Sequence, residues 1–301
     1  MTTEAPRPSG LAIVDKPAGW TSHDVVGRMR RMAGTRRVGH AGTLDPMATG
    51  VLVLGVERAT RLLGHLVLAD KAYDAMIRLG RATTTDDAEG EQTLAGDPAG
   101  IDEAAVRAQL ARLTGDIMQR PSSVSAIKVD GRRAHARVRA GEQVRLAPRP
   151  VHVARLDLLA MRTAEVDGLP VLELAVAVEC SSGTYVRALA RDLGAALGVG
   201  GHLGALRRTR VGPFRIEAAR TLEQLAALPD PVTLPLPEAV RAGMPVRMVS
   251  ADEAAELSHG RRLAPSGIDG VHGAIDPAGR AVALLEDSGG AARPVLVFEP
   301  A

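Results

Sequence analysis

A carboxylate with unusual neighbours is the first feature of this chain that could do chemistry. Asp45 lies in the segment Gly42-Thr43-Leu44-Asp45-Pro46. A following proline restricts the preceding residue to extended backbone conformations, and nearby glycine lets a substrate approach the main chain closely. Asp45 is therefore a candidate nucleophile or base. The alternative is that Asp45 caps a turn, which its spacing alone favours.

The few aromatic side chains lie beside basic ones. The chain has one Trp, two Tyr and two Phe, although a fold of this size usually places many aromatics in its core. Lys71 lies two residues before Tyr73, and Arg187 lies two residues after Tyr185. A ring that stacks on a base, with a cation for a phosphate, is typical of a single-stranded nucleic-acid site. The alternative is a tyrosine at an element end with its hydroxyl in water.

Charge is segregated along the chain, although the net charge is only +2. Residues 120–155 contain nine basic and two acidic side chains, and residues 185–220 contain seven and two. Residues 221–301 contain six and eleven. This segregation favours a basic face for a polyanion and a separate acidic C-terminal unit, with ordinary solvated surface charge as the alternative.

Composition and missing motifs exclude several classes. The 301 residues are 46% hydrophobic and 24% charged, which indicates a soluble globular chain. No apolar run approaches the roughly 20 residues that span a bilayer, and residues 1–10 lack the apolar segment of a signal peptide. Cys180 is the only cysteine, so we expect a cytoplasmic protein without disulfides. The sequence has no P-loop, zincin or paired CxxC motif, and we expect no metal.

Hydrophobic periodicity predicts the elements that must position these residues. We expect strands at residues 11–14, 51–56, 73–79 and 172–178, and short C-terminal strands at 281–285 and 295–298. We expect a helix capped by Ser22 and ending by Gly34, a helix capped by Asp102, and a helix that follows residue 185. Residues two apart on a helix differ by about 200° in direction. Tyr185 and Arg187 can therefore face one pocket only if Tyr185 precedes the first full turn.

Prolines suggest how the chain is divided. Four prolines fall within residues 229–237, and a helix interior does not tolerate them. We expect a mobile tail at 1–9, a catalytic domain at 10–228 with an insertion at about 120–150, a Pro-rich linker at 229–245 and a small β domain at 246–301.

Six motifs, taken in order, resemble those of the TruB-type bacterial tRNA pseudouridine synthases. They are DKPAGWTSHDVV (15–26), RVGHAGTLDPMATGVL (37–52), KAYDAMIRLG (71–80), TDDAEG (85–90), PSSVSAIKVDGRRAH (121–135) and CSSGTYVRALARDLG (180–194). Those enzymes isomerise the uridine at position 55 of the tRNA T arm. Residues 246–301 are similar, more weakly, to a PUA-like RNA-binding domain.

The resemblance implies an α+β fold: a mixed, mainly antiparallel sheet flanked by helices and loops, with a small C-terminal PUA-like β-barrel. It implies tRNA as the partner through its T-arm stem-loop, no cofactor, no membrane or protein partner, and a monomer. Asp45 matches the family's catalytic aspartate, which attacks either the base or the sugar. Tyr73 matches the tyrosine that stacks on the flipped uracil, and Arg187 the arginine that pairs with the catalytic carboxylate.

Further positions match residues that line the pocket or contact RNA. Leu206 matches an apolar residue of the pocket wall, and His40 a histidine at the point where the base leaves the stack. Lys16 lies in the motif that supports the site. The remaining candidates lie in the quoted motifs: Tyr185, Asp87, Lys71, Lys128, Arg132 and Arg133.

Two departures from the family pattern concern RNA binding. Val124 and His135 stand where the family commonly has aromatic residues. We hypothesise that arginines of the insertion replace them through phosphate contacts; these are Arg132, Arg133, Arg137 and Arg139. Two other functions remain open: a non-catalytic RNA-binding protein on the same scaffold, and a glycosidase with Asp87 as the second carboxylate beside Asp45.

Overall fold

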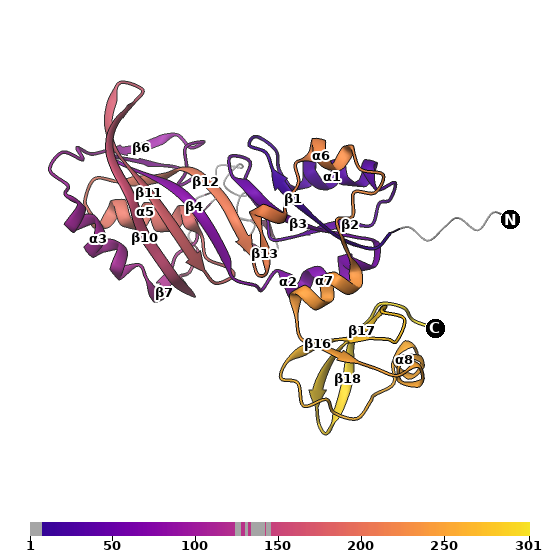
Figure 1. The fold of residues 1–301 in the computed structure, drawn as a ribbon. Coiled ribbons are helices and arrows are strands. Elements are labelled where there is room, and N and C mark those ends of the chain that lie inside the picture. Colours follow the sequence, from indigo (N-terminus) through magenta and orange to yellow (C-terminus); the bar gives the residue numbers. More distant parts are fainter. Residues whose placement is uncertain (1–7, 124–127, 130–131, 134–141, 143–145) are drawn as a thin grey trace. The chain divides into compact units, whose positions relative to one another are not determined.

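The computed structural model describes residues 8–123, 128–129, 132–133, 142 and 146–301 (Figure 1). Contacts divide the chain into two compact units. The first unit comprises Met1–Pro46, Gly50–Leu68 and Val211–Ala301, and the second comprises Met47–Thr49 and Ala69–Arg210. The class is α+β with mainly antiparallel sheets, as the resemblance implied.

The first unit is built around two buried strands. β1 (Gly10–Lys16) pairs antiparallel with β3 (Thr49–Val56) along its whole length, and β2 (Val38–Ala41) pairs with β3. The residues of β1 and β3 are nearly all buried. They contain the unbroken apolar runs 11–14 and 51–56, which are typical of strands covered on both faces. No strand was predicted at β2, because its glycine and histidine give no apolar alternation.

Helix α1 (Ser22–Met32) begins one residue earlier than a cap at Ser22 would place it. Thr21 is the N-cap, and its side chain and that of Asp24 form a capping box. The prediction that Ser22 caps this helix is wrong, because Thr21 already satisfies the free amide and the Ser22 side chain is turned inward and buried. Val25 and Met29 are fully buried and belong to the apolar face of α1.

The Pro-rich segment is structured. β14 (Leu234–Pro235) pairs with β1, and α7 (Leu236–Gly243) follows it directly. The expectation that the prolines exclude a helix here is wrong for a local reason. Pro237 lies in the first turn of α7, where no intrahelical partner awaits the missing N–H, and Pro235 lies on an edge strand.

The C-terminal residues form a small sheet in the order β15-β16-β17-β18. The strands are β15 (Val246–Met248), β16 (Val271–Ile275), β17 (Ala281–Ser288) and β18 (Ala291–Val297). β15 and β16 are parallel, and the other pairs are antiparallel. Among the described strands, no pairing of β15 with β18 closes this sheet into a barrel. α8 (Ala251–Ser258), capped by Ser250, packs against β17 and β18.

The second unit has a sheet in the order β12-β4-β11-β10-β7. These strands are β12 (Gly201–Val211), β4 (Lys71–Leu79), β11 (Leu169–Cys180), β10 (Arg149–Val166) and β7 (Gly115–Gln119). β4 alternates between buried and more exposed residues, as its sequence predicted. Asp167 and Gly168 join β10 to β11, and both have positive φ. Such a pair suits a tight hairpin turn.

Two helices pack on this sheet and complete its core. α3 (Glu103–Arg112) is capped by Asp102, as predicted, and contacts β10, while α5 (Val186–Ala196) contacts β4 and α3. Their buried side chains, including Val106 and Leu189, join those of β4 and β11 in one cluster. Tyr185 is the N-cap of α5 and has an extended backbone. This confirms the prediction that Tyr185 precedes the first turn.

Shorter elements complete the two units. They are η1 (Glu57–Leu62), α2 (Leu63–Leu66), β13 (Phe214–Arg215), η2 (Ile216–Ala218) and α6 (Leu222–Ala226) in the first unit, and β5 (Arg81–Thr83), β6 (Gln92–Ala95), β8 (Lys128–Val129) and β9 (Arg132–Arg133) in the second. None of the helices described has both the length and the apolar composition to cross a bilayer.

Candidate active site

Asp45 lies in the loop between β2 and β3, and a buried lysine holds the main chain beside it. Lys16 is fully buried. Its Nζ donates to the carbonyl oxygens of Pro17 (2.8 Å), Trp20 (2.6 Å) and Pro46 (3.2 Å). The amide of Gly19 also donates to the Pro46 carbonyl, at 2.9 Å. Lys16 therefore fastens the loop before α1 to the residue that follows Asp45.

The residue before Asp45 is held from the other side. The Ser22 hydroxyl donates to the carbonyl of Leu44 at 3.1 Å and accepts from the amide of Leu44 at 2.9 Å. Both Ser22 and Leu44 are buried, while Asp45 is partly exposed. Asp45 thus lies between two main-chain positions that are fixed from within the first unit.

His40 is half-buried on β2. Its ring meets the ring of His23, in the first turn of α1, edge to face, with the centroids 5.6 Å apart and the planes at 79°. Two imidazole rings therefore lie together in the first unit, and one of them, His40, is five residues before Asp45 in the sequence.

Arg187 lies in the first turn of α5 and is buried with an acidic partner. Its Nη1 lies 3.3 Å from Oδ2 of Asp87, and only 6% and 4% of the two side chains are exposed. The same nitrogen donates to the carbonyl of Thr85 at 2.9 Å. Asp87 Oδ1 accepts from the Thr85 hydroxyl (2.5 Å) and the Glu89 amide (3.0 Å). Asp87 thus holds the guanidinium and is itself enclosed, which argues against a role for Asp87 as a glycosidase acid.

Asp86, the residue before Asp87, pairs with Arg191 in the next turn of α5. Asp86 Oδ2 accepts from Arg191 Nη1 at 3.0 Å. Burial raises the pKa of Asp86, and the charge of Arg191 acts against that rise. Arg191 also donates to the carbonyl of Arg120, where the insertion begins, at 2.7 Å. The two aspartates of the TDDAEG motif therefore attach their loop to two arginines one helical turn apart.

Tyr185 is held through its main chain by Gln119, the last residue of β7. The Gln119 carboxamide donates to the Tyr185 carbonyl at 3.1 Å and accepts from the Tyr185 amide at 2.8 Å. Gln119 is almost completely buried. These bonds fix the start of α5, which has no side-chain cap of its own.

The other candidates of the second unit lie on β4 and β12. Tyr73 is largely buried opposite Val178, and Leu206 packs against the same apolar cluster. Lys71, opposite Cys180, is buried and donates to the carbonyl of Ala69 at 2.6 Å. Burial, reinforced by the charge of Arg208, lowers the pKa of Lys71 to about 8.

The predicted residues fall into two groups by unit. Lys16, His40 and Asp45 belong to the first unit, and Lys16 contacts the loop of Asp45. The second unit brings Arg187 and Asp87 together and carries Tyr73, Lys71, Leu206 and Tyr185. Lys128 lies in β8, and Arg132 and Arg133 lie in β9, which pair with each other. Val124, His135, Arg137 and Arg139 lie outside the described residues.

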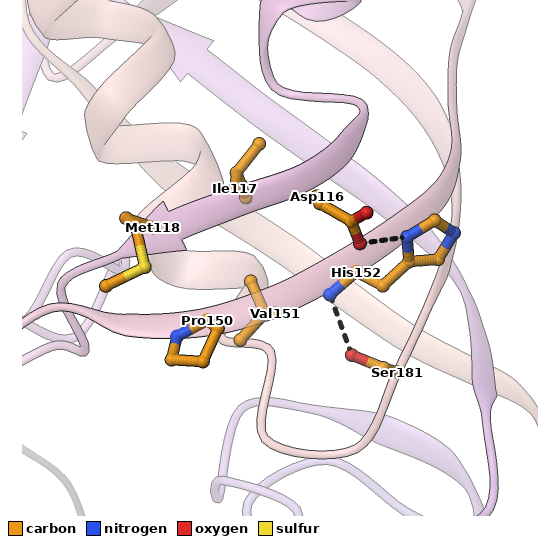
Figure 2. Close-up of a pocket in the computed structure, with 7 residues that line it drawn as sticks. All are labelled: Asp116, Ile117, Met118, Pro150, Val151, His152 and Ser181. Carbon is orange, nitrogen blue, oxygen red and sulfur yellow. Dashed lines mark hydrogen bonds and ion pairs between the residues drawn. The ribbon is translucent and has the colours of Figure 1, made fainter.

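A hollow of about 480 Å³ lies at the β7 edge of the second sheet (Figure 2). Figure 2 shows the His152 ring joined to Asp116 and the His152 main-chain amide joined to the Ser181 hydroxyl. These hydrogen bonds are 2.7 and 2.9 Å long. The apolar wall is formed by Ile117, Met118, Pro150 and Val151. None of the predicted site residues lines this hollow. Two of its polar side chains, Asp116 and His152, bind each other.

Gln119 was not predicted as a residue of the site, and Ser22 was wrongly predicted to cap α1. A signal for the second error was present, because Thr21 and Asp24 have the spacing of a capping box. No signal pointed to Gln119, whose partner lies 66 residues away. Within the described residues, no cluster of His, Cys, Asp and Glu side chains could hold a metal ion.

Comparison with protein families covers nearly the whole chain. Residues 30–186 match the family model "TruB family pseudouridylate synthase (N terminal domain)". Residues 187–231 match "tRNA pseudouridylate synthase B C-terminal domain", and residues 244–299 match "tRNA Pseudouridine synthase II, C terminal".

Individual proteins agree with this match. The chain is 63% identical to tRNA pseudouridine synthase B of Rhodococcus jostii (strain RHA1), covering 97% of this chain and 95% of the relative. It is 56% identical to the protein of that name from Corynebacterium glutamicum (strain R), covering 100% and 99%. Among solved structures, "Crystal structure of the archaeal box H/ACA sRNP Nop10-Cbf5 complex" matches with a TM-score of 0.69 at 28% identity, covering 98% of this chain and 87% of the other.

Proposed function

Because this chain belongs to the TruB family of pseudouridylate synthases, we propose that it isomerises the uridine at position 55 of the tRNA T arm. Conversion of uridine to pseudouridine in tRNA is the family's reaction. The position of the uridine and the roles of individual residues are the proposed part. The loop around Asp45 carries the proposal, because it has the GHAGTLDP motif and is held on both sides by buried side chains.

The reaction sets clear demands on the site. The bond between N1 of uracil and C1′ of ribose breaks, C5 bonds to C1′, C5 loses its hydrogen as a proton, and N1 gains one. No oxidation and no external group transfer occur, so the chemistry calls for no cofactor. The nucleotide must first leave the stack, at a cost of a few kcal/mol. We assign to Tyr73 and Leu206 the stacking and apolar contacts that offset this cost.

Asp45 is proposed as the nucleophile, with attack at C6 of the base or at C1′ of the ribose. We assign to Arg187 the role of cationic partner of that carboxylate. The buried contacts of Arg187 with Asp87 and Thr85 support this role, because they hold one edge of the guanidinium in place. Lys16 supports the loop of Asp45 through the main chain.

We assign RNA contacts to basic and aromatic residues around this chemistry: His40, Tyr185, Lys71, Lys128, Arg132 and Arg133. Residues 10–228 would carry catalysis, and residues 246–301 would add a smaller contribution to RNA binding because they are acidic. We further propose that the enzyme acts as a monomer in the cytoplasm.

The position is tested with T-arm stem-loops that carry tritium at C5 of their uridines. The protein should release tritium stoichiometrically from one uridine. Replacing the uridine at position 55 by cytidine should abolish release, whereas the same replacement at another uridine should not. Release that survives the change at position 55 would refute the assigned position.

A further inference from the structure

The hydroxyl of Ser22 makes both of its strong hydrogen bonds to a single residue, Leu44. We propose that Ser22 is a positioning residue for catalysis, which holds the main chain of Leu44 so that Asp45 presents its carboxylate in one orientation. This inference rests on the proposed role of Asp45 as the nucleophile.

The two bonds fix the chain at the position that matters. The Leu44 carbonyl belongs to the peptide group that joins Leu44 to Asp45, and the Leu44 amide belongs to the preceding peptide. A single hydroxyl that binds both therefore restricts rotation about the Leu44 α-carbon. On the far side of Asp45, the Pro46 carbonyl is held by Lys16 and by the Gly19 amide. The backbone that carries the Asp45 side chain is thus restrained on either side.

Ser22 is free for this task because another residue begins the helix. Thr21 and Asp24 form the capping box of α1, so the helix does not need the Ser22 hydroxyl. Ser22 is 1% exposed, and a buried hydroxyl is costly unless it is hydrogen-bonded. Its location in the first turn of a capped helix gives the bonds to Leu44 a rigid base.

Loss of the hydroxyl should therefore affect the chemical step more than RNA binding. In Ser22→Ala, the amide and carbonyl of Leu44 lose their partner and the loop can move. A displacement of about 1 Å at a reacting group costs up to about 100-fold in rate. We expect the single-turnover rate of Ser22→Ala to fall about 10- to 100-fold, with an unchanged Kd for a T-arm stem-loop.

The matched control is Thr21→Ala, which removes the cap of the same helix and leaves the Leu44 bonds in place. Loss of such a cap costs about 1 kcal/mol of stability, so a purely structural effect would appear in both variants. Single-turnover tritium release and filter binding are measured for both, at a temperature where both remain folded. Ser22→Cys serves as a second variant of similar size whose thiol is a weak hydrogen-bond partner, and it should also be slow.

Slow reactions in both Ser22→Ala and Ser22→Cys, beside a wild-type rate in Thr21→Ala, support the proposal. Equal rates in Ser22→Ala and Thr21→Ala, or a wild-type rate in Ser22→Cys, would overturn it. Failure of the proposed function gives a different result, since the wild type itself would then release no tritium.

Discussion

The side chain of Gln119 and the main chain of Tyr185 exchange two hydrogen bonds, although 66 residues separate them. One residue ends β7 immediately before the insertion, and the other is the N-cap of the helix that carries Arg187. The start of that helix is therefore fixed by an amide from a strand edge.

Gln119→Glu should weaken this attachment, because a carboxylate oxygen would replace the donor that faces the Tyr185 carbonyl. We expect a loss of about 1–3 kcal/mol in the free energy of unfolding and a slower single-turnover reaction. Urea unfolding measures the first quantity. Gln92→Glu, at an exposed position of β6, is the control and should change stability by less than about 0.5 kcal/mol. Equal effects of the two substitutions would contradict this account.

The buried pair of Arg187 and Asp87 should contribute far more to stability than a surface pair. Asp87→Ala leaves a guanidinium buried without its carboxylate, which typically costs about 3–5 kcal/mol. Arg107 and Glu103 form an exposed pair, with 54% and 56% of their side chains accessible. Glu103→Ala should cost no more than about 1 kcal/mol. Denaturant unfolding of both variants checks the difference, and similar losses would show that Asp87 does not hold Arg187.

Lys71 should make stability depend on pH in the alkaline range. Its pKa falls from 10.5 to about 8 in the folded protein because of burial. Between these values the unfolded chain binds more protons, so this group's contribution to stability rises with pH. The stability of Lys71→Met relative to the wild type should therefore fall by up to about 3 kcal/mol between pH 8 and pH 10.5. A difference that stays constant across this range would contradict the lowered pKa.

Asp287 should support the C-terminal sheet only while it is ionised. Burial raises its pKa, but hydrogen bonds from the Gly267 amide and from the amide and hydroxyl of Ser266 outweigh burial and lower it overall. A lowered pKa means that the stabilisation is present above the ordinary value of 3.8 and is lost as the pH falls through the folded value.

Thermal unfolding should accordingly separate Asp287→Ala from the wild type at pH 6, and the gap in Tm should be smaller at pH 3. Asp269→Ala, at an exposed position in the same region, provides the control and should leave the Tm unchanged at both pH values. A gap for Asp287→Ala that does not depend on pH would contradict this reasoning.

Periodicity predicted the elements that bury one face or one stripe. The strand of Tyr73 and the helix after Tyr185 were recognised because their apolar residues recur at the period of each element. α7 was missed because its prolines were counted without regard to position, although a helix tolerates proline in its first turn. β2 was missed because it is held by its partner strand and not by a pattern of its own.

For the candidate site, the sequence likewise predicted some features and not others. Motifs predicted Asp45, Arg187 and Asp87 as site residues, and helix geometry predicted that Tyr185 precedes the first turn of α5. The contacts that hold these residues were not predictable, because they join main chain to side chain over long separations. Arg187 binds a carbonyl 102 residues away, and Ser22 binds one 22 residues away. Only the folded chain brings such groups together.

Tritium release by Asp45→Asn tests the central claim most directly. The substitution keeps the size of the side chain and removes the nucleophilic carboxylate. A T-arm stem-loop labelled at C5 is mixed with excess wild type or variant, and filter binding is measured in parallel. We expect stoichiometric release by the wild type, none by Asp45→Asn, and equal binding by both. Release by Asp45→Asn at the wild-type rate would contradict the role of Asp45, and binding without release by the wild type would contradict catalysis.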